Sequence, residues 1–420
     1  MPRKMFSFVA AVLTFAALLL SLTAAHAADT ERVLESLDGI SAGAPYGLVA
    51  DASGSLYGVG NPTSSHKNGT IFRLRKASDG RWGMAVLYEF KGWTDGSFPS
   101  NYLIFDSTGN IYGTTAYAGG VTGCSCGIVF ELTPTASGPW KETTLYSFKG
   151  GTDGAVPVSG VSAAADGNFY GTTTTGGQPY NSGTVFKLSP ISGGGWSESV
   201  IYNFQGGSDG ADPIAQLVLD KRGNFFGLTG FGGSSACPNG CGTIFEISPD
   251  SGSWSEKVIY VFTNGADGVP GLAALAIDDA GNLYGATPNG GVVSSCNGGG
   301  CGAVFELSRD SQGGWSFTTL YSFLDGNDGA SPEATLAVTR AGHIYGATSG
   351  GGMPCLCGTV FELSPNSGGG WVETILYTFA GGNDGELPYG GFLRSSAGSL
   401  YGTTLAGGTA NKGTVFEIIP

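Results

Sequence analysis

The feature that most constrains the fold is a short pattern that recurs seven times along the chain. The pattern Gly-x-(Leu/Ile/Phe)-(Tyr/Phe)-Gly begins at Gly54, Gly109, Gly167, Gly223, Gly281, Gly342 and Gly398. Each copy is followed by a GTVF-like element, such as GIVF at Gly127. Six copies of an LYSF-like element with a following Asp-Gly complete the set, as in LYSFKGGTDG at 145–154. The chain therefore consists of seven repeats of about 57 residues, and such fixed-period repetition is typical of solenoids and propellers.

Each repeat contains four short runs of β-strand composition separated by turn residues. In the second repeat these runs are YLIFD, NIYGTT, IVFELTP and WKETTLYSF, the last covering 140–148. No segment has helical periodicity over three turns, so we predict an all-β chain. Seven four-stranded units of this length indicate a seven-bladed β-propeller. An open β-solenoid is the alternative, although these repeats are long for one.

The two ends of the chain predict how such a ring closes. The LYSF-like run is found only six times, so the last repeat lacks an outer strand after Phe416. The segment RVLESLDGISAGAP at 32–45 aligns with TLYSFKGGTDGAVP and supplies that strand. We predict that Arg32–Leu37 pairs beside the C-terminal GTVFEI strand, with Val33 and Leu37 buried. Closure would remove an open sheet edge, which otherwise favours aggregation.

The first 27 residues have the pattern of a secretory signal peptide. Two basic residues precede an uncharged apolar run from Phe6 to Leu22, and the small-residue pattern Ala25-His26-Ala27 follows it. A membrane anchor is the alternative interpretation, because the run is nearly long enough to cross a bilayer. We predict cleavage after Ala27 and a single propeller domain over 28–420. The product would be secreted, either periplasmic or extracellular, without a transmembrane anchor.

Charge and composition limit the partners of this chain. Its formal net charge is −14 at pH 7, which disfavours nucleic acid and anionic lipid surfaces as partners. With 41% hydrophobic and 11% aromatic residues, the chain is too apolar to be disordered, so its 75 glycines are expected to serve turns. We expect a monomer that binds no nucleic acid.

In its repeated elements the chain resembles the GloVer tandem-repeat proteins, which are exported bacterial proteins. The resemblance rests on GTVF, LYSF, Asp-Gly and GNIYGTT elements that recur in one order over nearly all of the chain after residue 27. It implies a propeller-like repeat fold and export, and it implies no particular activity. More distantly, DSTGNIYGTT resembles the inner hairpin of NHL-type propellers and of the streptogramin lyases.

Strands within a blade alternate in direction, so two sets of loops are expected on one face. One set carries an aspartate in six repeats: Asp95, Asp153, Asp209, Asp267, Asp328 and Asp384. Together these rim aspartates could attract a cation. An Asp side chain in a turn commonly accepts hydrogen bonds from its own backbone, and we favour this structural role. No calcium-loop spacing is present, and we predict neither a metal site nor a cofactor.

The other set of loops holds every cysteine of the chain. They fall as Cys124 and Cys126, Cys237 and Cys241, Cys296 and Cys301, and Cys355 and Cys357. Export permits disulfides, and pairing within each loop is the simplest connectivity. Zinc is disfavoured, because each of these loops offers two cysteines and no histidine.

At the starts of the inner strands, several residues depart from the repeat and form a candidate ligand-binding site. Other repeats carry mostly small residues there, whereas these positions hold Asn101, Tyr102, Gln216, Glu333, Thr335 and Tyr389. A position that differs between blades does not serve the blade and is free to serve a ligand. Tolerated variation at a wet channel mouth is the alternative explanation.

The sequence offers no recognisable catalytic set. His66 and His343 are expected on opposite faces, and no Gly-x-Ser-x-Gly, phosphate-binding loop or His-Glu-x-x-His element is present. We therefore name no catalytic residue. The leading hypothesis is an exported binding or interaction scaffold for a glycan, a surface polymer or another exported protein. A secreted hydrolase or lyase with its site on the channel-mouth rim is the alternative, so the sequence leaves open whether the protein is an enzyme.

Overall fold

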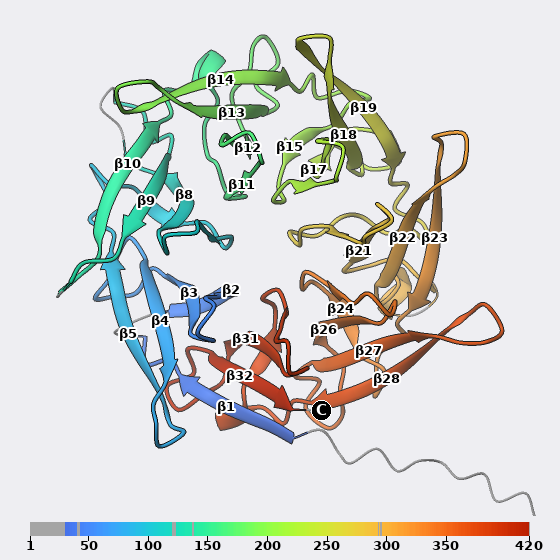
Figure 1. The fold of residues 1–420 in the computed structure, drawn as a ribbon. Helices are drawn as coiled ribbons and strands as arrows, with labels where there is room; N and C mark the ends of the chain where they lie inside the picture. The colour runs from blue at the N-terminus through green and yellow to red at the C-terminus, as the bar shows by residue number, and fades with distance from the viewer. Residues whose placement is uncertain are drawn as a thin grey trace, which may run out of the picture.

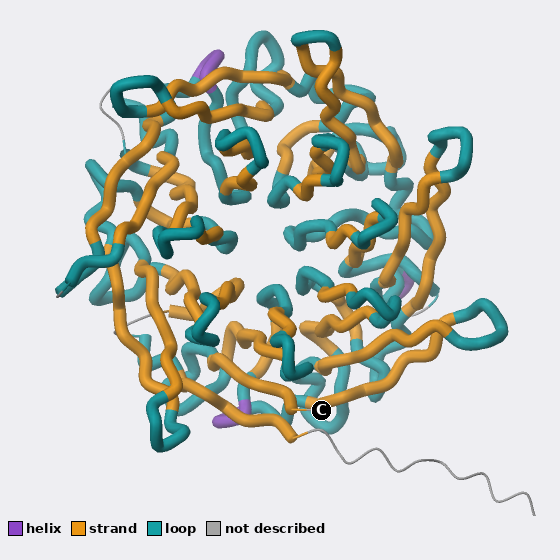
Figure 2. The backbone as a smooth tube through the Cα atoms, in the orientation of Figure 1, coloured by secondary structure: helices purple, strands orange, loops and turns teal. Residues whose placement is uncertain are grey.

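The computed structural model describes residues 30–419 except for 40–42, 120–122, 137, 293 and 295. The described residues form seven antiparallel sheets arranged as blades around a central axis (Figure 1). The predicted fold class, an all-β seven-bladed propeller, is confirmed. The helical segments drawn are short turns near the periphery of the ring (Figure 2). The predicted signal peptide at 1–27 lies outside the described residues.

Six of the blades follow chain order from their inner to their outer strands. Blade 1 contains β2 (Gly43–Ala50), β3 (Leu56–Asn61), β4 (Thr70–Lys76) and β5 (Trp82–Glu89). Blade 2 contains β6 (Ser97–Pro99), β7 (Ile104–Phe105), β8 (Ile111–Tyr117), β9 (Ile128–Thr133) and β10 (Lys141–Ser147). Blade 3 contains β11 (Val161–Ala163), β12 (Phe169–Thr173), β13 (Thr184–Pro190) and β14 (Trp196–Asn203). Blade 4 contains β15 (Ala211–Pro213), β16 (Val218–Leu219), β17 (Phe225–Phe231), β18 (Thr243–Asp250) and β19 (Ser253–Val261). Blade 5 contains β20 (Ala276–Ile277), β21 (Leu283–Thr287), β22 (Ala303–Arg309) and β23 (Trp315–Ser322). Blade 6 contains β24 (Ala330–Pro332), β25 (Ala337–Val338), β26 (Ile344–Gly350), β27 (Thr359–Pro365) and β28 (Trp371–Thr378).

Blade 7 combines the two ends of the chain. It contains β29 (Glu386–Pro388), β30 (Leu393–Arg394), β31 (Leu400–Ala406), β32 (Thr414–Ile419) and β1 (Thr30–Ser36). The single-turn 3-10 helices assigned within the described ranges are η1 (Gly151–Asp153), η2 (Cys296–Gly298) and η3 (Gly382–Asp384). Within the same ranges, no helix is long and apolar enough to span a membrane.

The innermost strand is interrupted in blades 2, 4, 6 and 7. In blade 2, β6 and β7 both pair with β8, and residues 100–103 lie between them. The sequence predicted one continuous strand, YLIFD, of which β7 keeps only Ile104 and Phe105. Residues in such a break are released from the strict side-chain alternation of a strand. Their side chains can therefore face the central channel.

Strand β1 closes the ring, as predicted. It pairs antiparallel with β32, from Thr30 opposite Ile419 to Ser36 opposite Thr414, and it begins two residues earlier than the predicted Arg32–Leu37. Figure 1 shows the blue β1 along the outer edge of the red blade.

The residues that β1 buries differ in part from the prediction. Leu37 is buried as expected, but Leu34 is buried as well, and Val33 is only half-buried. The pairing register shifts between Val33 and Glu35, and such a bulge reverses the side-chain alternation beyond it. Leu34 and Leu37 pack in a cluster that includes Leu56 of blade 1. The strand therefore joins the last blade to the first.

Phenylalanine pairs link consecutive blades from blade 1 to blade 7, including Phe262 with Phe305 between blades 4 and 5, whose ring centroids are 5.9 Å apart. Phe148 of the LYSF element in blade 2 packs against Phe186 of the GTVF element in blade 3, with ring centroids 5.1 Å apart. The same contact recurs as Phe90–Phe130, Phe204–Phe245, Phe323–Phe361 and Phe379–Phe416. The Tyr-Gly glycine makes room for the ring, because a Cβ added at Gly171 would lie 2.6 Å from Phe186 Cζ. These contacts explain why the same elements recur in the repeats.

Removing β1 should open the ring. A protein that begins at Pro45 should aggregate or melt at a much lower temperature than one that begins at Ala28, because it loses two buried leucines and exposes the edge of β32. Each buried leucine contributes roughly 1.5–3 kcal/mol to the free energy of unfolding. Calorimetry and size-exclusion chromatography measure the two effects. A monomer beginning at Pro45 with an unchanged Tm would contradict closure by β1.

Candidate functional site

The two faces of the propeller carry different loops. We call one the crossing face, because it holds the crossings from each outer strand to the next inner strand, such as 90–96, and also the loops between second and third strands. We call the other the hairpin face, because it holds the turns that join first to second strands, such as 106–110, and third to fourth strands. The predicted site residues lie between these two faces, in the breaks of the inner strands that border the channel.

The six candidate ligand-binding residues line one cavity of about 220 Å³ between the inner strands, in the central channel. They lie in the breaks of the inner strands: Asn101 and Tyr102 between β6 and β7, Gln216 between β15 and β16, Glu333 and Thr335 between β24 and β25, and Tyr389 between β29 and β30. The fold thus brings residues from four blades to one pocket, which we call the mouth pocket.

Tyr102 spans the channel from blade 2 to blade 5. Its hydroxyl donates to the carbonyl oxygen of Leu272 at 3.0 Å and accepts from the backbone N–H of Ala274 at 3.0 Å. Figure 1 shows blades 2 and 5 on opposite sides of the axis. Burial raises the pKa of the Tyr102 phenol, so the bridging hydroxyl stays protonated. The Tyr102 side chain therefore bridges the channel and forms part of the pocket wall, and we call this bridge the crossbar.

Two further candidate residues connect neighbouring blades. The Thr335 hydroxyl of blade 6 also accepts from Ala274 N–H, at 3.2 Å. The Gln216 amide of blade 4 donates from Nε2 to the carbonyl oxygen of Val161 in blade 3, at 2.8 Å. Both side chains line the pocket while holding its wall together.

Asn101 and Glu333 are the polar pocket residues with side chains left for a ligand. Among the described residues, neither side chain has a hydrogen-bond or ion-pair partner, whereas Tyr389 does have an interaction partner. Burial raises the pKa of the Glu333 carboxyl. Glu333 is also the one carboxylate among the described residues that line this pocket.

The rim aspartates make the same contacts in every blade that has one. Each accepts a hydrogen bond from the tyrosine of the preceding LYSF-like element: Tyr88 to Asp95, Tyr146 to Asp153, Tyr202 to Asp209, Tyr260 to Asp267, Tyr321 to Asp328 and Tyr377 to Asp384. Each also accepts from the backbone N–H four residues earlier, as Asp153 does from Lys149 at 2.7 Å. These contacts tie the end of the outer strand to the crossing that follows it.

A glutamate of the next blade faces most of these Tyr–Asp pairs. Glu142, Glu198, Glu256, Glu373 and Glu31 hold this position, and their pKa values are raised by burial and by the neighbouring aspartate. For Glu373 the pKa rises to about 8, with Asp328 as the nearby charge. Lys149 partly offsets the effect at Glu198. In blade 5 the position holds Phe317, which stacks on Tyr260 with ring centroids 4.2 Å apart.

The cysteines lie where the sequence placed them, two to a loop. The pairs are Cys124 with Cys126, Cys237 with Cys241, Cys296 with Cys301, and Cys355 with Cys357, with Cα atoms 5.2 to 5.3 Å apart. This spacing suits disulfides within each loop. In the described part of the chain, no group of three or more His, Cys, Asp or Glu side chains is arranged to hold a metal ion.

The two histidines of the described part of the chain lie on opposite faces, each beside a glutamate. His66 Nδ1 is 2.8 Å from Glu89 Oε1 in a loop of the crossing face. His343 Nδ1 is 2.5 Å from Glu362 Oε1 next to a turn of the hairpin face. Neither histidine lines the mouth pocket.

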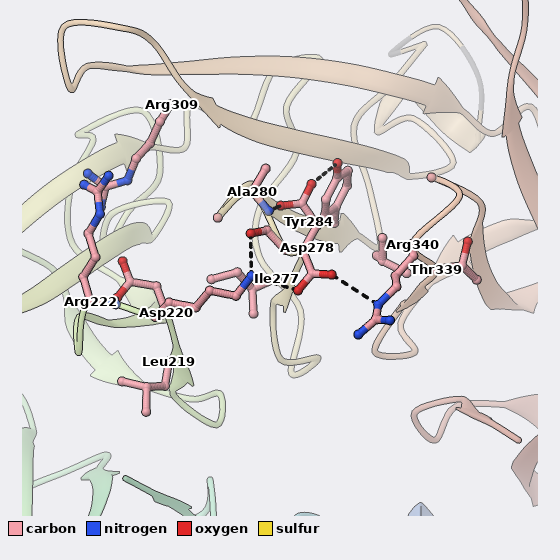
Figure 3. Close-up of a pocket in the computed structure, with 15 residues that line it drawn as sticks. Leu219, Asp220, Arg222, Ile277, Asp278, Ala280, Tyr284, Arg309, Thr339 and Arg340 are labelled. Atoms are coloured by element: carbon pink, nitrogen blue, oxygen red, sulfur yellow. Dashed lines mark hydrogen bonds and ion pairs between the residues drawn. The ribbon is translucent and has the colours of Figure 1, made fainter. Parts of the chain in front are cut away.

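Sequence reasoning missed a larger cavity on the hairpin face. This cavity, of about 710 Å³, lies over the first turns of blades 4, 5 and 6 and is lined by Lys221, Arg222, Arg309 and Arg340 (Figure 3). The signal was present in the sequence, because comparing the repeats position by position shows that these turns depart from the others. We call this cavity the turn pocket.

The ring of seven four-stranded blades, with an axial pocket formed by positions that break the repeat, defines a repeat-built seven-bladed β-propeller. The Gloeobacter/Verrucomicrobia repeat matches residues 18–237, 125–353 and 238–420. The chain belongs to this repeat family, which confirms the resemblance drawn from its repeated elements. A search of curated protein sequences finds no match.

Solved propellers share the fold at low sequence identity. The extracellular domain assigned to a one-component system of B. thetaiotaomicron is 12% identical with a TM-score of 0.54, and the match covers 93% of this chain and 42% of that one. A catalytically inactive virginiamycin B lyase from Staphylococcus aureus is 13% identical with a TM-score of 0.47, over 93% and 99%. PorZ, a surface component of the type-IX secretion system of Porphyromonas gingivalis, is 13% identical with a TM-score of 0.45, over 85% and 45%. At these identities the likeness shows the fold alone.

The acidic pairs between blades should make the protein more stable at mildly acidic pH. Glu373 has a folded-state pKa of about 8 against an ordinary value of 4.5. Its contribution to the free energy of unfolding is therefore complete below pH 4.5 and is lost as the pH rises through about 8. Thermal melts at about pH 5 and about pH 9 should give the higher Tm at the lower pH.

A single substitution separates these pairs from the general charge of the chain. Glu373→Gln keeps a neutral side chain at every pH, so it should reduce the difference in Tm between the two pH values. Asp250→Asn, an exposed carboxylate in the outer hairpin of blade 4, should leave the difference unchanged. Equal pH dependence in the wild type and Glu373→Gln would show that this pair does not titrate as described.

Proposed function

We propose that this protein is a binding propeller whose ligand occupies the mouth pocket. The observation that carries the proposal is the convergence of all six repeat-breaking residues on one cavity. In a protein built from repeats, residues shared by every blade are accounted for by the fold. Residues that differ and still meet at one point are best explained by a ligand.

The chemistry of the pocket suits a hydroxylated ligand such as the end of a glycan or a surface polymer. Asn101 and Glu333 offer an amide and a carboxyl group, and Tyr102 and Tyr389 add aromatic surface. Amides and carboxylates bind sugar hydroxyls as donors and acceptors, while aromatic rings cover the apolar face of a sugar ring. A volume of about 220 Å³ accommodates one such ring.

The crossbar limits how a polymer could bind. Because Tyr102 bridges to Leu272 and Ala274 across the channel, a ligand that enters from the crossing face meets a wall. A polymer is therefore held by its terminal unit and not threaded through the ring.

A hydrolase or lyase is the second candidate function. The supporting observation is the raised pKa of Glu333, which suits a general acid. Glycoside hydrolases ordinarily use two carboxyl groups, and the described lining residues include only this one. A second carboxyl group could come from a rim aspartate or from Glu386 at the start of β29, but none of these residues lines the pocket. The lining therefore favours binding over glycoside hydrolysis.

We also propose that the protein acts outside the cytoplasm as a monomer. The signal-peptide pattern at 1–27 supports export. The paired cysteines support an oxidising compartment. A glycan, a surface polymer or another exported protein is the partner that this location suits.

Glycan-array screening of the protein beginning at Ala28, followed by titration calorimetry with the best ligand, tests the binding site. Glu333→Gln should weaken binding at least about tenfold and Asn101→Ala about fivefold, because hydrogen bonds to charged groups contribute roughly 1.5–3 kcal/mol and neutral ones about 1 kcal/mol. Gln312→Ala, an exposed residue of the outer hairpin in blade 5, is the matched control and should bind as the wild type does.

The same preparation distinguishes the competing functions. Turnover of a bound glycan that is lost in Glu333→Gln would replace the binding function by the enzymatic one. Wild-type affinity in both pocket variants would contradict the mouth pocket as the site, and a lack of any glycan bound would contradict the ligand class.

A further inference from the structure

The turn pocket on the hairpin face has an apolar floor and a charged rim. Its floor is formed by the last inner-strand residues of three successive blades, Leu219, Ile277 and Val338. Its rim carries four of the 19 lysine and arginine residues of a chain whose net charge is −14. The same lining holds three aspartates, Asp220, Asp278 and Asp279, so the pocket gathers charged side chains of both signs.

The repeat does not explain these cations. The turn position of Lys221, Asp279 and Arg340 in blades 4, 5 and 6 is occupied in the other repeats by Ala52, Ser107, Ala165 and Ser396. Arg309 stands where five other repeats carry a proline, at Pro134, Pro190, Pro249, Pro365 and Pro420. Small residues and proline therefore suffice for the blade at these positions, and the charges serve another purpose.

Most charges at the rim are paired with one another. Lys221 Nζ lies 3.0 Å from Asp279 Oδ1, and Arg340 Nε lies 3.3 Å from Asp279 Oδ2, so one carboxylate is shared by two cations. All three side chains are mostly exposed, and exposed ion pairs are weak enough to rearrange around a ligand. The turn aspartates Asp220 and Asp278 accept hydrogen bonds from their own turns.

Arg309 and Arg222 do not share the Asp279 carboxylate: Arg309 is paired with a buried glutamate, and Arg222 is exposed. The Arg309 guanidinium is held 2.5 Å from the buried Glu246 carboxylate and 4.4 Å above the ring of Trp315. Arg222 makes no ion pair among the described residues, and its side chain is exposed. Figure 3 shows Arg222 and Arg309 extending toward the same end of the pocket. One fixed and one unpaired guanidinium thus meet beside an apolar floor.

We propose that the turn pocket binds an amphiphilic anion, with its acidic group at Arg222, beside Arg309, and its apolar body over Leu219, Ile277 and Val338. Guanidinium groups bind carboxylate, sulfonate and phosphate oxygens through two parallel hydrogen bonds. A cavity of about 710 Å³ is in the range that holds a small organic ligand. Asp279 pairs with Lys221 and Arg340 and lowers the positive charge of the pocket. The turn pocket shares no lining residue with the mouth pocket and does not depend on the function proposed there.

The test uses 8-anilinonaphthalene-1-sulfonate, which carries a sulfonate on an apolar ring system. The folded protein beginning at Ala28 should bind one equivalent, measured by the rise in probe fluorescence. Arg222→Gln should weaken binding at least about fivefold, because it removes a charge-assisted hydrogen bond. Asp279→Asn should strengthen binding, because it removes a carboxylate from the pocket and frees Lys221 and Arg340, which makes the pocket more positive. Opposite effects in two single substitutions at one rim are not produced by loss of folding.

Two controls complete the experiment. The neutral analogue N-phenyl-1-naphthylamine lacks the sulfonate, so its binding should be insensitive to Arg222→Gln. Arg81→Gln, an exposed arginine of blade 1 that pairs with Asp79, should leave sulfonate binding unchanged. Lack of stoichiometric binding, equal effects of Arg222→Gln and Arg81→Gln, or weaker binding in Asp279→Asn would each overturn the proposal.

Discussion

Closure of the ring by β1 is the constraint on which the rest of the structure depends. A four-stranded blade is too small to bury its own apolar faces, so each blade relies on the blade before it and the blade after it. The pairing of β1 with β32 gives the last blade its outer strand, and Leu34 and Leu37 seal that blade against the first. The interface between the last blade and the first, and the closed channel that the blades surround, exist because this one contact joins the two ends.

The interfaces between blades combine an apolar layer with a polar one. Phenylalanines such as Phe148 and Phe186 make the apolar contact. Toward the crossing face, a tyrosine, an aspartate and a glutamate meet between the same two blades, as Tyr321, Asp328 and Glu373 do. The Tyr–Asp contacts hold each of these crossings against the outer strand that precedes it. The neighbouring glutamates have raised pKa values, so they keep their protons at a higher pH than an exposed carboxyl group does.

Repetition also separates structural residues from candidate functional ones. The rim aspartates recur with the tyrosines that bind them, so the blade accounts for them. The six candidate residues of the mouth pocket and the cations of the turn pocket do not follow the repeat, yet each set lines one cavity. The two sets share no residue and differ in chemistry. One offers an amide and a single carboxyl beside tyrosine rings, and the other offers guanidinium groups beside an aliphatic floor.

The sequence by itself determined the fold, the number of blades and the strand that closes the ring, because each is encoded by local elements that repeat with a fixed period. It also identified Asn101, Tyr102, Gln216, Glu333, Thr335 and Tyr389 as departures from that period. Only the tertiary structure decided that Leu34 is buried in place of Val33, since a bulge depends on how two strands pair. It likewise decided that Tyr102 reaches Leu272, 170 residues away, and that the cations of the turn pocket meet. Those contacts depend on the radius of the closed ring and on where the inner strands break, and no local pattern in a sequence records either quantity.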